Sequence, residues 1–174
     1  MTDNKGDAER AELHRTIWNI ANDLRGCVDG WDFKQYVLGI LFYSYISENL
    51  TNFVNKRKRD AGNLDFDYAK MRDEEALEIK DELVATKGFF ILPSELFENV
   101  RKNALNDKNL NETLEKVFKN IEASALGAAS EKNFKGLFDD IDVNSNKLGS
   151  TVEERNKKLV KLLNAIGDMQ LGDY

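Results

Sequence analysis

The fold is decided by the stretch Trp31-Asp-Phe-Lys-Gln-Tyr-Val-Leu-Gly-Ile-Leu-Phe-Tyr43, which remains largely apolar as far as Ile46. Between Tyr36 and Ile46, apolar residues would lie on nearly every side of a helix, a pattern typical of a central, enclosed helix. The run has only 11 residues, well short of the roughly 20 that cross a bilayer. Asp32, with Gln35 three positions later, predicts the start of this helix through a capping box. We therefore expect a buried central helix on which the rest of the chain packs.

Apolar residues elsewhere recur at spacings of three and four, which predicts further amphipathic helices. We expect them at Leu13–Leu24 before Gly26, Ala76–Val84 before Gly88, Leu96–Val100 after the cap Ser94, Leu114–Leu126 before Gly127, and Val152–Ile166 after a capping box of Ser150 and Glu153. Phe89 to Leu92 is too short to classify by periodicity, and we expect it to be extended. The sequence thus predicts an all-α fold, a multi-helix bundle with at most one very short strand-like segment near residues 89–92.

Length and composition favour one folded domain. The chain has 174 residues and a single proline, so it is long enough for a real core and shows no obvious linker; we expect one helical domain over residues 1–174. Hydrophobic residues make up 41% and charged residues 32% of the chain, which argues against a membrane-embedded protein. The first ten residues lack the apolar core of a secretory signal, and the lone Cys27 excludes an internal disulfide. A cytoplasmic protein without membrane contact is expected.

The chain is acidic as a whole but contains one local cluster of basic residues. The formal charge is −6, so the chain as a whole repels a polyphosphate, and any nucleic-acid contact requires a local basic surface. Lys56, Arg57, Lys58 and Arg59 form the only dense basic cluster, at the predicted end of the central helix. Four such cations can follow a phosphate backbone, each neutralised phosphate adding salt-dependent affinity. They would equally complement the negative C-terminal end of the helix dipole. The two roles are compatible, and these four residues are the DNA-contact candidates.

The segment Asp142 to Glu153 approaches the spacing of a calcium-binding loop. With Asp142 as position 1, Asn144 and Asn146 fall at positions 3 and 5, and Glu153 falls at position 12. Position 6 is Lys147, where such loops need glycine for a sharp turn, and its ammonium would repel the cation. The alternative is a polar turn whose side chains bond their own backbone, followed by a capped helix. We expect the polar turn and no metal ligand, and keep a small calcium sensor as a competing hypothesis.

Other chemistry-bearing residues suggest no active site. Asp139, Asp140 and Asp142 form an acidic group able to hold magnesium, but magnesium sites usually also recruit substrate phosphates. His14 is the only histidine, so a zinc set is not available, and catalysis by Cys27 would need that histidine as its base. The sequence contains neither a GxGxxG motif nor a P-loop. No catalytic or cofactor-binding residue is expected.

Five stretches, in order along Glu12 to Tyr174, resemble the N-terminal region of the modification subunit of Type I restriction-modification systems. They are Ile17-Trp-Asn-Ile-Ala-Asn-Asp-Leu-Arg-Gly26, Trp31 to Tyr43, Gly88-Phe-Phe-Ile-Leu-Pro-Ser-Glu-Leu-Phe97, Phe134-Lys-Gly-Leu-Phe-Asp-Asp-Ile-Asp-Val-Asn-Ser-Asn-Lys-Leu148, and Arg155-Asn-Lys-Lys-Leu159. The resemblance implies a helical region that helps to assemble the modification complex and to close it around double-stranded DNA. It also implies as partners a specificity subunit, a second modification subunit and a restriction subunit.

The resemblance places the chemistry outside this chain. Such subunits methylate adenine N6 with S-adenosylmethionine, using a glycine-rich loop and an Asn-Pro-Pro-Phe or Asn-Pro-Pro-Tyr motif that holds a flipped-out adenine. The single proline here, Pro93, follows Leu92, so the motif is impossible within these residues. We expect the chain to be truncated before the methyltransferase domain, to bind no cofactor, and to be non-catalytic by itself. The alternative is a stand-alone helical protein-interaction domain that makes no DNA contact.

Overall fold

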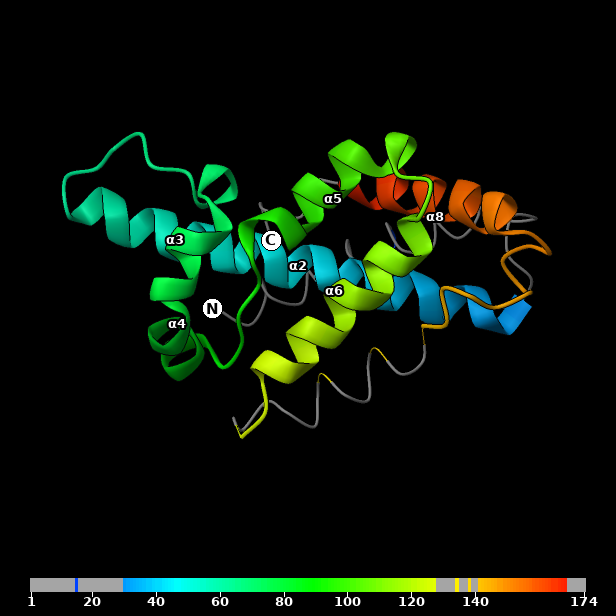
Figure 1. The fold of residues 1–174 in the computed structure, drawn as a ribbon, viewed down its shortest axis with the longest axis horizontal. Helices are drawn as coiled ribbons and strands as arrows, with labels where there is room; N and C mark the ends of the chain where they lie inside the picture. The colour runs from blue at the N-terminus through cyan, green and yellow to red at the C-terminus, as the bar shows by residue number, and fades with distance from the viewer. Residues whose placement is uncertain (1–14, 16–29, 128–133, 135–137, 139–140, 169–174) are drawn as a thin grey trace.

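The computed structural model describes Arg15 and residues 30–127, 134, 138 and 141–168. Its longest element is helix α2 (Gly30–Asp60), which runs through the bundle and lies alongside most of the other helices (Figure 1). The predicted start at Asp32 is wrong by two residues, so Asp32 lies inside the helix and is not its N-cap. The reason is that a cap signature locates a helix boundary only to within a residue or two. The helix predicted at Leu13–Leu24 falls outside the described residues, as do His14, Cys27, Asp139 and Asp140.

Helix α2 provides the centre of the core. Its buried apolar side chains are Tyr36, Val37, Ile40, Leu41, Tyr43, Ile46, Leu50 and Val54. Burying each such side chain stabilises the fold by about 1.5–3 kcal/mol relative to leaving it exposed. The predicted enclosure holds on most sides, but Leu38 and Tyr45, seven residues apart, face outward. The central helix therefore has one open face.

The C-terminal end of α2 is closed by a Schellman motif. The Gly62 N–H donates to the carbonyl of Arg59 at 2.9 Å, and the Asn63 N–H donates to the carbonyl of Lys58 at 2.9 Å. Gly62 has a φ of +97°, which a residue with a Cβ adopts only with strain. The predicted end of the central helix at the basic cluster is confirmed.

The single helix predicted over Ala76–Val84 is wrong, because the structure contains two helices there. These are α3 (Asp73–Glu78) and α4 (Lys80–Lys87), separated at Ile79, whose φ of −106° and ψ of 7° leave the helical region. Ala76 and Leu83 are both buried, so the apolar spacing continues across the break. Periodicity records burial but not a change of axis, which is why the sequence pattern did not reveal it. Gly88, with φ +87°, ends α4 as predicted.

In the connector between α4 and the next helix, residues 89–92 form neither helix nor strand and Leu92 is extended, as predicted; no β-strand occurs in the described ranges. Side chains from other elements bond its backbone: the Phe90 N–H donates to Ser124 Oγ at 2.9 Å, and the Ile91 carbonyl accepts from the Tyr68 hydroxyl at 2.6 Å. The Tyr43 hydroxyl donates to the carbonyl of Glu95. These bonds replace the ladder of a sheet, so buried Phe89, Phe90 and Ile91 need no partner strand.

Helix α5 (Phe97–Asn103) is not capped by Ser94, and that prediction is wrong. Ser94 instead bonds Asp73, its hydroxyl lying 2.6 Å from Oδ2. The first N–H of α5, that of Phe97, donates to Ser47 Oγ of α2 at 3.1 Å. The cap thus comes from a residue 50 positions earlier, which local sequence spacing cannot indicate.

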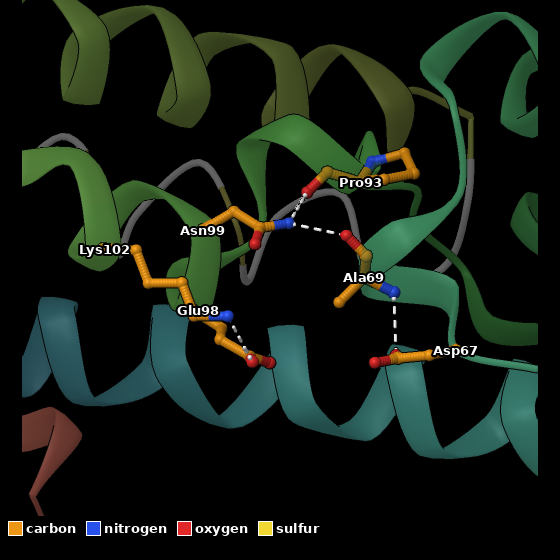
Figure 2. Close-up of polar contacts among 6 residues, drawn as sticks. All are labelled: Asp67, Ala69, Pro93, Glu98, Asn99 and Lys102. Carbon is orange, nitrogen blue, oxygen red and sulfur yellow. Dashed lines mark hydrogen bonds and ion pairs between the residues drawn. The ribbon is translucent and has the colours of Figure 1, made fainter.

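Short 3₁₀ segments, η1 (Tyr68–Lys70), η2 (Pro93–Glu95) and η3 (Ala104–Asn106), complete the connections. Figure 2 shows how Asn99 of α5 joins two of them: its amide Nδ2 donates to the carbonyl of Ala69 at 2.8 Å and to that of Pro93 at 2.7 Å. Asp67 accepts from the Ala69 N–H at 3.0 Å in the same view, which caps η1. The joint fixes η1 and η2 against α5.

Helices α6 (Leu110–Ser124) and α8 (Val152–Gly167) pack against each other, and α8 also contacts α2 and α5 (Figure 1). Helix α6 ends three residues before Gly127, so Leu126 lies outside it and is 66% exposed, contrary to the prediction. The capping box of α8 is shifted by one residue: Thr151 accepts from the Glu154 N–H, and Glu154 bonds Ser150. Val152 consequently points outward at 45% exposure.

Buried aromatic side chains connect the segment before α8 to the core. Phe134 and Phe138 pack against Phe42 of α2, and Phe138 stacks on Phe118 of α6 with ring centroids 4.6 Å apart. Such aromatic pairs add about 0.5–1.5 kcal/mol beyond the area they bury. The predicted all-α bundle is confirmed.

Candidate functional site

The four cations predicted as DNA contacts occupy the last turn of α2 and its approach. Lys56, Arg57 and Arg59 are exposed and Lys58 is half-buried. Their position at the carboxyl end of a helix satisfies the predicted complement to the helix dipole. The helix turn spreads them around the axis, since successive residues rotate by about 100° at 3.6 residues per turn. The four side chains therefore face different neighbours.

Arg57 is turned toward α4. Its guanidinium is paired with the carboxylate of Glu82 and lies 5.4 Å from the centre of the Phe53 ring. Lys87, in the last turn of α4, approaches the same ring, with Nζ 5.1 Å from its centre. Cation–π contacts of this kind contribute about 0.5–1 kcal/mol at exposed sites. Arg57 thus helps to hold α4 against the end of α2.

Lys58 faces a different neighbour. Its Nζ lies 5.4 Å from the centre of the Phe66 ring, in the loop that follows α2. Lys56 and Arg59 keep exposed side chains, with Asn52 exposed one turn before Lys56. In the predicted cluster, Arg57 and Lys58 therefore contact neighbouring segments, whereas Lys56 and Arg59 face solvent.

Lys87 was not predicted as part of this surface. It lies 28 positions beyond Arg59 in the chain, and a lysine just before a terminating glycine is an ordinary feature of a helix end. Only the packing of α4 on α2 brings it to Phe53. No signal in a single sequence would have found it.

The Asp142 loop is built as a polar turn. Asp142 Oδ1 accepts from the Asn144 N–H at 3.0 Å. The Asn144 side chain accepts from Asn111 at 2.6 Å and donates to Glu115 at 3.2 Å, which fastens the loop to α6. Glu153, the expected twelfth position of a calcium loop, forms an ion pair with Lys157 at 3.7 Å. These oxygens already have protein partners, which favours the polar-turn interpretation over calcium binding.

Buried polar groups near the connector also serve the backbone. Burial raises the pKa of the Glu95 carboxyl above its usual value, although a 2.8 Å hydrogen bond from Asn120 and the charge of Lys116 act in the opposite direction. Burial, with a contribution from Glu95, raises the pKa of the Tyr43 hydroxyl well above its usual value. A buried tyrosine that donates to a carbonyl is a neutral structural donor, not a catalytic acid.

A groove of about 710 Å³ lies between α2, α5 and α8. Its charged side chains are paired: Arg101 with Asp168, and Glu98 with Lys102 at 3.3 Å (Figure 2). Mixed and mutually neutralised charge does not select a class of ligand. In the described part of the chain, no group of three or more His, Cys, Asp or Glu is arranged to hold a metal. None of the described helices has the length and apolar content needed to span a membrane.

The fold and its surface define a helical bundle with a basic end. The family model described as the HsdM N-terminal domain matches residues 13–166, and the chain belongs to this family of N-terminal regions of Type I restriction-modification methylase subunits. The resemblance stated from the sequence is therefore confirmed.

Two known proteins are similar to the chain. The Type I restriction enzyme MpnII methylase subunit of Mycoplasma pneumoniae is 46% identical over 177 residues, which cover 98% of this chain and 32% of that protein. The crystal structure of a type I restriction-modification system methyltransferase subunit from Streptococcus thermophilus matches with a TM-score of 0.73 at 24% identity, covering 94% of this chain and 35% of that one. The latter shows the same fold. The chain spans about a third of the length of these relatives.

Proposed function

We propose that the chain is the helical N-terminal part of an adenine-N6 DNA methyltransferase subunit and serves to assemble the modification complex and close it around DNA. The observation that carries this proposal is the family match over residues 13–166, in a chain that spans about a third of its relatives. In this proposal the region contacts a specificity subunit and a second modification subunit, and the complex also engages a restriction subunit. Its substrate, double-stranded DNA, places the complex in the cytoplasm.

The proposed region does not carry out methyl transfer. Its one proline excludes an Asn-Pro-Pro-aromatic motif within the 174 residues. The buried polar side chains around the connector hold backbone groups, as Tyr43, Tyr68 and Ser124 do. We assign S-adenosylmethionine binding and the attack of the adenine amino group to the remainder of the subunit.

The proposal is tested by comparing the full-length subunit with a variant lacking residues 1–174, each assembled with its specificity subunit. The shortened subunit should still bind S-adenosylmethionine, which shows that it is folded, while duplex affinity falls by at least about tenfold, or 1.4 kcal/mol. Titration calorimetry and gel-shift titration provide the two readouts. A shortened complex that binds and methylates DNA as well as the full-length complex would refute the proposal.

A second candidate is an interaction domain without DNA contact. The ion pair of Arg57 with Glu82 and the contact of Lys58 with the Phe66 ring favour this second candidate, because half of the basic cluster already has a structural role. Removal of residues 1–174 would release the specificity subunit in this case, as loss of assembly under the first proposal also would, so DNA binding separates the two. Duplex binding by whatever complex remains would then keep its original dependence on salt.

A further inference from the structure

Cations from two helices converge beside one aromatic ring. Lys56 and Arg57 lie three and four residues after Phe53, so both flank this ring on the surface of α2. Lys87 reaches the same ring from α4. Three like charges around one half-buried ring repel one another, and one carboxylate, that of Glu82, is placed on Arg57.

The helical positions separate these cations into two directions. Taking Phe53 as the origin, Arg57 lies about 40° to one side, and Lys56 and Arg59 lie about 60° and 120° to the other side. The Glu82 carboxylate is therefore on the Arg57 side. Lys87 lies over Phe53, and Lys56 and Arg59 lie on the side away from Arg57; we call these three cations the basic band, beside which exposed Asp60, seven residues after Phe53, adds one carboxylate. Lys58, about 140° from Phe53 on the Arg57 side, belongs to the Phe66 contact and not to this band.

We propose that this basic band, Lys87, Lys56 and Arg59, binds the phosphate backbone of duplex DNA, and that Arg57 is a positioning residue that holds α4 and Lys87 in place. The proposal rests on the proposed function, because it names the surface through which the region would close on DNA. A duplex fits the band better than an acidic protein segment does, since the cations follow the curved face of a helix and their contacts need only repeated charge. The like-charge repulsion within the band would be relieved when phosphates bind.

The test uses the complex of the full-length subunit and its specificity subunit, titrated with duplex DNA at several salt concentrations. Each cation that contacts a phosphate contributes about 0.9 to the slope of log affinity against log salt. The variant K56Q/R59Q/K87Q should reduce the magnitude of this slope by about 2.7, and K87Q alone by about 0.9. K102Q/K119Q/K157Q removes the same charge from ion pairs on α5, α6 and α8, and should leave the slope unchanged.

Arg57 requires a separate readout. R57Q, which loses the Glu82 pair and the Phe53 contact, should lower the melting temperature more than K56Q or R59Q, which lose only a charge at the helix end. An unchanged slope in K56Q/R59Q and in K87Q would overturn the inference, even if the triple variant failed to fold. If removal of residues 1–174 still weakened DNA binding, the proposed function would stand and only the assigned surface would be wrong. If that removal had no effect either, both would fail.

Discussion

Gly39 of α2 lies directly against Ile141 of the segment that precedes α8. A Cβ at this position would lie 1.8 Å from Ile141 Cδ1 and 2.5 Å from Cγ1. Alanine would gain about 0.5–1 kcal/mol in helix propensity. Overpacking a core costs about 1–3 kcal/mol, so the clash should dominate. We expect Gly39→Ala to lower the free energy of unfolding by about 1–2 kcal/mol, as measured by urea denaturation.

Two controls separate the clash from the loss of a glycine. Ile141→Ala removes both clashing atoms, so Gly39→Ala should cost little in that background. Gly167→Ala would meet the Arg101 side chain of α5, which can shift more easily than a buried isoleucine, and should have a smaller effect. If Gly39→Ala were equally costly with and without Ile141, steric contact would not be the cause.

Glu95 gives the fold a defined response to pH. Its folded-state pKa is raised mainly by burial, so the folded protein holds the proton more tightly than the unfolded chain does. Stability from this residue is therefore present at low pH and is lost as pH rises through the raised pKa. We expect Glu95→Gln, which can still accept from Asn120, to raise the melting temperature at pH 8 and to change it little at pH 4.

Glu154 is a control of opposite sign. Hydrogen bonds from Ser150 lower the pKa of its carboxyl, so its contribution is present at neutral pH and is lost as pH falls through the lowered value. Glu154→Gln should lower the melting temperature at pH 8 and have little effect at low pH. Two variants that shift in the same direction at pH 8 would contradict the assigned causes.

Among the elements, α5 depends on a cap from a distant part of the chain. The Phe97 N–H donates to Ser47 Oγ, whereas Ser94 bonds Asp73. Losing a capping side chain costs about 0.5–2 kcal/mol. We expect Ser47→Ala to lower the free energy of unfolding by about 1 kcal/mol and to speed amide exchange at Phe97.

Ser94→Ala is the informative comparison. Its side chain bonds Asp73 at an exposed position, so its loss should leave exchange at Phe97 unchanged. If Ser94→Ala speeds amide exchange at Phe97 and Ser47→Ala does not, Ser94 is the cap of α5, as the sequence predicted.

The same element shows why some features could be predicted and others could not. Helices α2, α6 and α8 follow from the sequence because their buried residues recur with the helical period, as Leu114, Phe118 and Ile121 do. The break at Ile79 leaves the pattern of buried residues intact, and the cap of α5 depends on a tertiary partner. Lys87 joins the candidate surface for the same reason, since packing and not spacing brings it to Phe53.

At the scale of the whole molecule, one hydrophobic cluster includes side chains from every described α-helix. Ala76 of α3 and Leu83 of α4 belong to it, although these helices form one end of the molecule (Figure 1). The pairing of Arg57 with Glu82 and the bond from Tyr68 to Ile91 connect that end to α2 and the connector. The described helices should therefore unfold together.

We expect a single thermal transition in which the calorimetric and van't Hoff enthalpies agree. Far-ultraviolet circular dichroism and tyrosine fluorescence should report the same midpoint. An earlier transition that R57Q lowers further would show instead that α3 and α4 unfold on their own.

Helix α2 spans 31 residues, or about 46 Å at 1.5 Å per residue. Near one end the Tyr36 hydroxyl donates to the carbonyl of Asp142, and at the other end lie Lys56 and Arg59. If the helix tilts as a rigid body about Tyr36, its basic end moves further than the end that contacts Asp142. A tilt of about 5° would move Arg59, which lies about 35 Å from Tyr36 along the helix, through about 3 Å, enough to seat or withdraw a side chain from a phosphate oxygen.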